Sequence, residues 1–449
     1  MKSTSAISIV GMGYVGLCTA ATFASRGIKT IGIDIDEARI EQIQRGKAPL
    51  HEPQLEGMLK RAVKQKLLGA TNHISGAGET DTTFLTVGTP SQENGSIDLS
   101  YIKNATEDLG NVLREKPGYH LVVVKSTVIP GTTNGTVKRF LEQSSGKKIG
   151  PELGLCANPE FLKEGTAIND ALHPDKIVIG SNEKKSASEL TRLYRRFYGS
   201  ELPPIISTSP EAAELVKYAS NAFLATKVSF INTIANIAQQ IPGVDVSTIA
   251  EAIGHDPRIG KLFLKAGPGY GGSCFHKDLQ ALINYSKNNG YNPHLFQATE
   301  DTNEHQANRV VSMAETLLGS LSNKRVAVLG LAFKKDTDDI REAASLRTIE
   351  SLMKKGASIV AYDPMAIANT KKQLADQIEY AENPRAALKE ADCAIIMTEW
   401  DELRKLEAKD FKAQMKTPNL VDARRIYDPG AFSDLNYVAI GVGPKRIPH

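Results

Sequence analysis

The sequence predicts an α/β protein in which two doubly wound, Rossmann-like parallel-sheet domains are joined by a long central helix and a helical domain. A strand, a glycine-rich turn and a helix follow one another near the N-terminus, and similar segments recur from about residue 325. Between the two repeats, residues 211–240 contain neither glycine nor proline. We therefore expect domains over residues 1–208, 209–318 and 319–449.

The first predicted strand is the apolar run "ISIVGMGYVG", residues 7–16, after which "LCTAATFASRG" is typical of a helix that ends at Gly27. A second strand, "TIGIDID", ends at Asp34. Further apolar strands are expected at residues 82–90, 120–128 and 153–161. The carboxyl ends of parallel strands line the ligand crevice of such a sheet, so small polar residues at these ends are candidates for a site.

The first turn has the spacing of a dinucleotide-binding loop. Gly11 permits the tight turn, Gly13 lets a diphosphate approach the backbone, and Gly16 allows close packing of helix and strand. Asp34 stands where an acidic residue accepts the 2′-hydroxyl of a ribose, which favours NAD over NADP. Nearby Arg39 leaves NADP open as an alternative.

Residues 211–240 carry apolar residues at helical spacing and predict one long helix. Pro210 and Glu211 are typical of a helix start. Its many small residues favour close packing against a second copy of the chain, so we expect a homodimer or a larger homo-oligomer.

The C-terminal part repeats the pattern of the first. "RVAVLGLAF" parallels the first strand and turn, "SIVAYDP" parallels "TIGIDID", and "ADCAIIMTEW" parallels a later strand. The second turn, "GLAFKKDTDD", lacks the second and third glycines of the first. It therefore predicts a doubly wound unit that binds a ligand other than a dinucleotide.

Composition excludes several classes of function. Lys and Arg number 54 against 51 Asp and Glu in 449 residues, and no run of five like charges occurs, which argues against nucleic-acid binding. A secretory signal and an apolar stretch of the roughly 18 residues that a membrane helix needs are both missing from the sequence, so we expect a cytoplasmic protein. The four cysteines form no CxxC pair and the histidines no HxxxH or HxH spacing, so we expect neither a disulfide framework nor a metal site.

Cys274 stands apart from the other cysteines because it lies in the glycine-rich segment "GPGYGGSCFHKD", residues 267–278, rather than in an apolar frame. The flanking glycines leave the sulfur uncovered, and Lys277 favours a thiolate. A thiolate next to an aldehyde forms a thiohemiacetal, which a nicotinamide can oxidise to a thioester. The alternative is a glycine-rich turn in which the cysteine has only a structural role.

The order of seven blocks resembles the UDP-glucose/GDP-mannose dehydrogenase family. The blocks are GxGxxG, "STVIPGTT", "NPEFLKEG", "ELVKYASNAF", "GPGYGGSCFHKD", "GLAFKKDTDDIRE" and "DARRIYDP". The resemblance implies an enzyme that oxidises the primary alcohol of a nucleotide sugar twice, to a carboxylic acid, with reduction of two NAD and a covalent cysteine intermediate. A two-electron alcohol dehydrogenase with a structural Cys274 remains the alternative from another reaction class.

The resemblance implies a catalytic set of Cys274, Lys217, Asn221, Asp278, Glu160 and Thr127. Lys217 and Asn221, four apart on the long helix, share a face and can donate to one oxyanion. Glu160, at the end of a predicted strand, is our choice of base for thioester hydrolysis. How the proton transfers divide among Asp278, a water held by Thr127 and Glu160 stays open.

The resemblance also implies two sets of contacts. The cofactor set comprises Gly11, Gly13, Tyr14, Val15, Gly16, Asp34, Arg39, Thr89, Thr127, Glu164, Lys277 and Arg341. The substrate set comprises Phe161, Leu162, Lys163, Glu164, Lys217, Asn221, Arg258, Tyr270, Gly271, Lys334 and Arg425. The "SCF" form at Cys274 favours UDP-glucose over UDP-N-acetylhexosamines and GDP-mannose, which remain alternatives. The chain departs from the commonest family form at His276, where proline is frequent, and we leave His276 outside the catalytic set.

Overall fold

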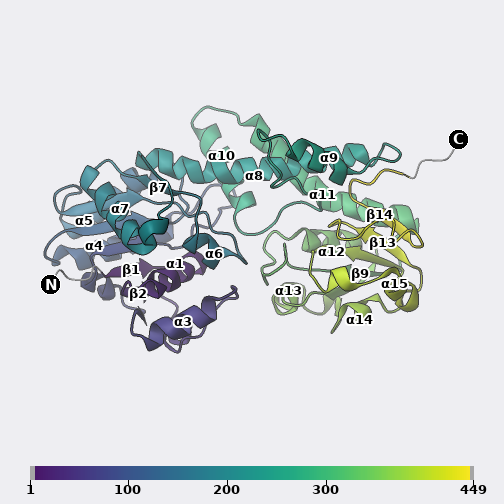
Figure 1. The fold of residues 1–449 in the computed structure, drawn as a ribbon, viewed down its shortest axis with the longest axis horizontal. Helices are drawn as coiled ribbons and strands as arrows, with labels where there is room; N and C mark the ends of the chain where they lie inside the picture. The colour runs from purple at the N-terminus through teal and green to yellow at the C-terminus, as the bar shows by residue number, and fades with distance from the viewer. Residues whose placement is uncertain (1–5, 445–449) are drawn as a thin grey trace. The chain divides into compact units, whose positions relative to one another are not determined.

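The computed structural model describes residues 6–444 and divides the chain into two compact units, residues 1–220 and 221–449, whose boundary falls within one long helix (Figure 1). That helix, α8 (Pro210–Ala238), confirms the helix predicted between the repeats. None of the helices in the described part of the chain is long and apolar enough to cross a membrane.

The first unit is built on an eight-stranded sheet with the order β3-β2-β1-β4-β5-β6-β7-β8. Its strands are β1 (Ile7–Val10), β2 (Thr30–Ile33), β3 (Leu68–Thr71), β4 (Thr82–Leu85), β5 (His120–Val124), β6 (Leu153–Ala157), β7 (Ile177–Gly180) and β8 (Ile205–Thr208). Its helices are α1 (Tyr14–Ser25), α2 (Glu37–Gln44), α3 (Leu55–Lys64), α4 (Ser100–Arg114), α5 (Lys138–Ser145), α6 (Ala167–Leu172) and α7 (Lys184–Tyr198).

Helices cover both faces of this sheet (Figure 1). Along β5, Leu121 and Val123 belong to the core beneath α1, α3 and α7, whereas Val122 and Val124 belong to the core beneath α4 and α5. This alternation follows from the two-residue period of a strand. The sheet is parallel from β3 to β6, but β6 and β7 run antiparallel, with Ala157 opposite Gly180.

The second unit confirms the predicted repeat, with a six-stranded parallel sheet in the order β11-β10-β9-β12-β13-β14. Its strands are β9 (Arg325–Leu329), β10 (Ser358–Tyr362), β11 (Glu379–Tyr380), β12 (Cys393–Ile396), β13 (Asn419–Asp422) and β14 (Asn436–Ala439). Its helices are α9 (Val246–Gly254), α10 (Phe275–Asn288), α11 (His294–Leu318), α12 (Ala344–Lys354), α13 (Ile367–Leu374), α14 (Pro384–Leu388) and α15 (Ala408–Gln414).

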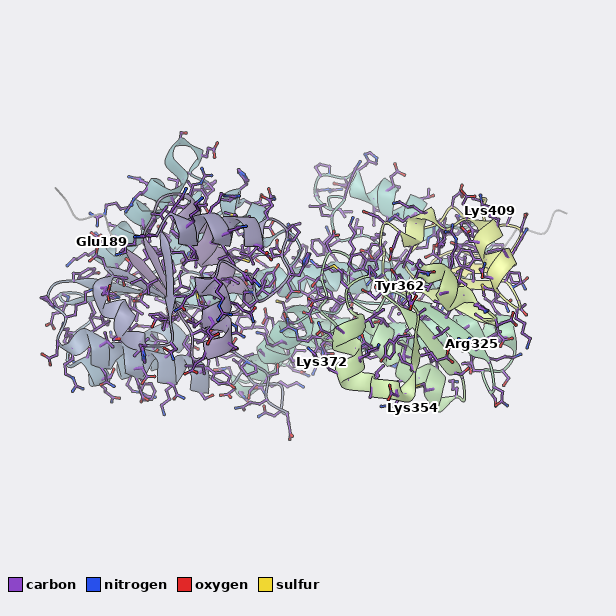
Figure 2. The ribbon with its side chains drawn as sticks, turned by 90° about the horizontal axis from the view of Figure 1, so that it is seen from below. Glu189, Arg325, Lys354, Tyr362, Lys372 and Lys409 are labelled. Atoms are coloured by element: carbon purple, nitrogen blue, oxygen red, sulfur yellow. The ribbon has the colours of Figure 1, made fainter. Side chains whose placement is uncertain are left out.

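The interior and surface of the second unit are clearly divided. Tyr362, at the end of β10, is buried, whereas Lys354, Lys372 and Lys409 lie exposed on the helices around the sheet (Figure 2). The β-strands β9, β10 and β12 are almost fully buried because helices cover both sides of a doubly wound sheet.

Candidate active site

The turn between β1 and α1 is shaped to receive a dinucleotide. Gly11 has a φ of +94°, and a Cβ there would lie 2.8 Å from the Val87 nitrogen. A Cβ on Gly16 would lie 1.9 Å from the Gly11 oxygen, so Gly16 permits the close approach of helix and turn. A Cβ on Gly13 would meet no other atom within 4 Å, which leaves open space in front of the first turn of α1. The unpaired N–H groups and dipole of that turn favour a diphosphate.

Asp34 follows β2, and its side chain is only 7% exposed. Its carboxylate accepts hydrogen bonds from the Met12 N–H at 2.6 Å and from Arg39 Nη1 at 2.9 Å. In the sequence, Arg39 kept NADP as an alternative cofactor. In the structure, Arg39 is paired with Asp34, the acidic residue that favours NAD.

The equivalent acidic residue of the second unit has a different role. Asp363 follows β10 and is 1% exposed. One of its oxygens accepts from the backbone N–H groups of Leu331 and Ala332 and from Trp400 Nε1 at 2.7–3.0 Å. The carboxylate therefore holds the turn after β9 in place, which agrees with a second turn that does not bind a dinucleotide.

Several residues expected at the cofactor and substrate sites meet within the first unit. The Thr89 hydroxyl donates to the Thr127 carbonyl at 2.8 Å. The Tyr14 hydroxyl donates to buried Glu52, and the Gly165 N–H donates to both groups. The segment that carries Phe161, Leu162, Lys163 and Glu164 is thereby anchored to the first turn of α1. Glu52 was not identified from the sequence.

Lys217 of α8 and Glu160, which follows β6, form a buried ion pair with 2.9 Å between Nζ and Oε1. Burial alone raises the pKa of Glu160, but the Lys217 ammonium and the Leu162 N–H outweigh this effect and hold the pKa below its usual value. Glu160 is therefore a carboxylate at neutral pH. The pair brings together the predicted base and one of the predicted oxyanion donors.

A second lysine, Lys125, lies at the end of β5 close to this pair. Burial lowers its pKa to about 8, opposed by the charge of Glu160. Its ammonium donates to Asn158 Oδ1 at 3.2 Å, and the same oxygen accepts from the Tyr194 hydroxyl. Neither Lys125 nor Asn158 was identified from the sequence, because both read as ordinary strand-end polar residues.

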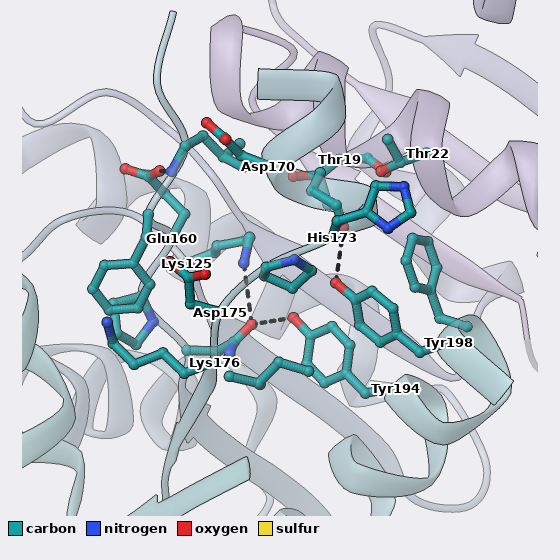
Figure 3. Close-up of a pocket in the computed structure, with 18 of the residues that line it drawn as sticks. Thr19, Thr22, Lys125, Glu160, Asp170, His173, Asp175, Lys176, Tyr194 and Tyr198 are labelled. Carbon is teal, nitrogen blue, oxygen red and sulfur yellow. Dashed lines mark hydrogen bonds between the residues drawn. The ribbon is translucent and has the colours of Figure 1, made fainter. Parts of the chain in front are cut away.

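A cavity of about 310 Å³ opens beside Glu160 in the first unit (Figure 3). Lys125 and Tyr194 both point toward Asn158 on its wall, and the Tyr198 hydroxyl donates to the Ala171 carbonyl at 2.8 Å. Residues 160–163, which include three expected substrate contacts, form part of the lining. The cavity therefore gives solvent and small molecules access to the side of the predicted base.

Glu214, three residues before Lys217 on α8, holds the loop after β5. Its two oxygens accept from the backbone N–H groups of Gly131 at 2.6 Å and Thr133 at 2.7 Å. A small cavity of about 10 Å³, the size of one water, is lined by Thr127, Glu214 and Lys217. The carboxylate thus fixes the loop that begins at Thr127 to the helix that carries Lys217.

Glu214 predicts a pH dependence of stability. Burial raises its pKa from 4.5 to about 7, although the two N–H donors oppose the shift. A pKa raised by folding means that the stabilisation is complete below pH 4.5 and is lost as the pH rises through 7. We expect the free energy of unfolding to fall by about 2–3 kcal/mol between pH 5 and pH 8 and Glu214→Gln to remove most of that fall, in urea titrations at several pH values. Glu56→Gln, at an exposed position of α3, should keep the wild-type dependence. An unchanged fall in Glu214→Gln would contradict the assignment.

Cys274 is exposed and stands immediately before α10, as its N-terminal flanking residue. One turn along α10, buried Asp278 accepts from Asn221 Nδ2 at 2.6 Å and from Lys277 Nζ at 2.6 Å. Lys277 is thus paired with the neighbouring carboxylate. Within the second unit the structure brings together Cys274, Asp278 and Asn221, three of the predicted catalytic residues.

The remaining expected contacts have varied surroundings. Arg425 is 8% exposed and pairs with Asp245 at 2.6 Å, whereas Arg258 is 86% exposed and pairs with Asp256. Lys163 pairs with Asp170 at 3.2 Å, and the Lys334 ammonium lies 5.4 Å from the Phe333 ring centre.

Arg341 contacts the glycine-rich segment: its side chain pairs with Asp339, and its backbone carbonyl accepts a hydrogen bond from the Gly272 N–H. A Cβ on Gly271 would lie 2.4 Å from the Glu342 oxygen, and the Tyr270 hydroxyl donates to Glu300.

These features define a class of protein. A glycine turn at a helix N-terminus with an acidic residue at the end of β2 is the site of a dinucleotide-dependent oxidoreductase. Among residues 6–444, no group of three or more His, Cys, Asp or Glu side chains is placed to hold a metal ion.

Comparison with known families gives the same class. Models of the NAD-binding, central and UDP-binding domains of the UDP-glucose/GDP-mannose dehydrogenase family match residues 5–198, 211–305 and 327–429. The chain belongs to this family, and NAD is its cofactor.

Relatives in the same family match nearly the whole chain. It is 43% identical to a UDP-glucose 6-dehydrogenase of Haloferax volcanii, over 94% of this chain and 96% of that protein. It is 39% identical to a UDP-glucose 6-dehydrogenase of Bacillus subtilis, over 98% of this chain and 94% of that protein. A solved UDP-glucose dehydrogenase from Pyrobaculum islandicum superposes with a TM-score of 0.91 at 36% identity, over 98% and 99% of the two chains. A solved UDP-D-ManNAc dehydrogenase from Pyrococcus horikoshii superposes with a TM-score of 0.86 at 26% identity, over 97% of this chain and 99% of that chain.

Proposed function

We propose that the chain oxidises UDP-glucose to UDP-glucuronate in two NAD-dependent steps. The observation that carries the proposal is the placement of exposed Cys274 at the start of α10, with Asp278 and its partner Asn221 one turn further on. A two-electron alcohol dehydrogenase has no need of an accessible nucleophile, whereas oxidation of an aldehyde to an acid is made easier by a covalent sulfur adduct.

NAD, held by the turn from Gly11 to Gly16 and by Asp34, supplies the oxidant for both steps. In the first oxidation the primary hydroxyl loses its proton, and the acceptors that we propose are Asp278 and a water held by Thr127. Lys217 and Asn221, one helical turn apart on α8, donate to the substrate oxygen as negative charge develops on it.

The second oxidation uses the sulfur. The Cys274 thiolate adds to the aldehyde carbon and forms a thiohemiacetal, whose oxidation gives a thioester. Glu160, kept ionised by Lys217, takes a proton from the attacking water. The carbon–sulfur bond then breaks, the carboxylic acid is released and the thiolate is restored. Each sugar oxidised therefore yields two NADH.

The nucleotide part of the substrate is supported by the UDP-binding domain matched by residues 327–429 and by Arg425. Arg425 Nε and Nη1 have no hydrogen-bond partner among the described residues, and guanidinium donors are suited to binding a diphosphate. UDP-glucose is favoured over another nucleotide sugar because the relatives named UDP-glucose 6-dehydrogenase are 34–43% identical to this chain, against 26% for the UDP-D-ManNAc dehydrogenase.

The proposal is tested by counting NADH released per sugar across a panel of UDP- and GDP-sugars. We expect two NADH per UDP-glucose. One NADH per sugar would identify a two-electron dehydrogenase. Activity with only another nucleotide sugar would mean that the same two-step oxidation acts on that sugar and not on UDP-glucose. No NADH with any sugar would overturn the proposal.

We also propose that residues 209–318 form a middle domain through which two copies associate. Phe223, Phe230 and Ile237 are 65%, 49% and 52% exposed, and their spacing of seven residues places them in one stripe along α8. The mass in solution tests this association. Free thiols persist most readily in a reducing compartment, which supports a cytoplasmic location.

A further inference from the structure

The segment that leads to Cys274 is attached to helix α11 through Tyr270. The Tyr270 N–H donates to Asn303 Oδ1 at 2.7 Å, and Asn303 Nδ2 donates back to the Tyr270 carbonyl at 3.1 Å. The Tyr270 hydroxyl donates to Glu300, one turn earlier on α11. Four residues before the cysteine, both the backbone and the side chain are therefore fixed to the same helix.

The segment that follows Cys274 is attached to the same carboxylate. His276 Nδ1 lies 2.5 Å from Glu300 Oε2, and Gln280 Nε2 donates to that oxygen at 3.1 Å. Glu300 thus contacts the chain on both sides of the cysteine, through Tyr270 before it and through His276 and Gln280 after it. We call these four side chains the Glu300 cluster.

Charge makes His276 the decisive member of the Glu300 cluster. The Glu300 side chain is 3% exposed, and a buried carboxylate is stable only with a cation or several donors close by. Tyr270 and Gln280 are neutral, so among the three partners only His276 can supply a positive charge. The hydrogen bond to Glu300 raises the pKa of His276, although burial opposes the shift.

Two other charged groups act on His276, one from the segment before α12 and one from the first turn of α12. Glu342 raises its pKa and Arg347 lowers it, and these two side chains pair with each other at 3.4 Å. Their opposite effects leave Glu300 as the group that governs the charge of the imidazole.

We propose that His276 is a positioning residue for Cys274, and that its imidazolium, paired with Glu300, holds the segment 267–278 in the arrangement that covalent catalysis needs. This inference rests on the proposed function, because it assigns the pair to the step in which the sulfur adds to the aldehyde. A pKa raised above the ordinary 6.5 means that the pair is complete at pH 6 and is lost as the pH rises through the raised value. His276 itself transfers no proton to the substrate.

Amide hydrogen exchange of peptides from residues 267–282, corrected for intrinsic rates, tests the pair without reference to activity. At pH 6 we expect His276→Gln to exchange about tenfold faster than the wild type, the scale of one hydrogen bond to a charged group. The wild type should approach the rate of the variant once the pH has risen above the raised pKa of His276. His276→Lys keeps a cation on both sides of that pKa and should stay protected.

His255 offers a matched control, since it is exposed and lies 3.9 Å from Glu251 elsewhere in the second unit. His255→Gln should leave the exchange of residues 267–282 unchanged. Equal exchange of His276→Gln and wild type at pH 6, or equal exchange of His276→Lys and His276→Gln, would overturn the proposal.

Activity provides the second measurement. We expect His276→Gln to slow acid formation about tenfold at pH 6 while the first NADH appears at an almost unchanged rate, and His276→Lys to move the alkaline loss of acid formation to higher pH. An equal reduction of both oxidations would contradict a role at the sulfur step. If no nucleotide sugar is oxidised, the proposed function fails, whereas the exchange measurements still decide the role of His276.

Discussion

Cys274→Ser is expected to bind NAD as the wild type does and to lose acid production by about a thousandfold or more. The expected NAD site lies in the first unit, whereas Cys274 belongs to the second and is exposed before α10. A serine hydroxyl is not ionised near neutral pH and forms no thioester that water can hydrolyse. The variant therefore retains the chemistry of the first oxidation and lacks the covalent step of the second.

The measurement is the amount of NADH and of acid formed from UDP-glucose, together with NAD affinity by calorimetry. Cys393→Ala is the matched control, because it removes a buried thiol from β12 of the same unit. It should keep two NADH per sugar at a modest loss of stability. Unaltered steady-state turnover in Cys274→Ser would disprove the covalent mechanism.

The features that the sequence predicted correctly are those with local signals. The turn from Gly11 to Gly16 and the matching segments near residues 7 and 325 each identify a strand, a turn and a helix from neighbouring residues alone. The long helix α8 was likewise predictable, because its bounds follow from the proline at its start and the absence of glycine within it.

The features that the sequence did not predict depend on partners far apart in the chain. Glu214 is separated from Gly131 by 83 residues, and nothing near either residue indicates their hydrogen bond. Lys125 reads as a polar strand end, and its buried position depends on α7 and the segment after β6. The reversal between β6 and β7 was also missed, since a short apolar strand carries no sign of its direction.

Two glycine variants are expected to distinguish an effect on stability from an effect on NAD binding. Gly16→Ala should destabilise the first unit by about 3 kcal/mol or more, because the new Cβ lies 1.9 Å from the Gly11 oxygen and the backbone must move apart. Gly13→Ala adds the same methyl group at the ordinary φ of −70°, where no other atom lies within 4 Å. Its stability should change by at most about 0.5 kcal/mol.

NAD affinity should respond differently. The Gly13 methyl group projects into the open space before α1, where the diphosphate is expected, so we expect Gly13→Ala to weaken NAD binding by about tenfold to a hundredfold while the fold stays intact. Thermal unfolding without NAD and calorimetric titration with NAD measure the two effects separately. If Gly13→Ala binds NAD as tightly as the wild type, the diphosphate lies elsewhere. The acidic residue at Asp34, rather than the glycine turn, would then be the remaining support for the cofactor site.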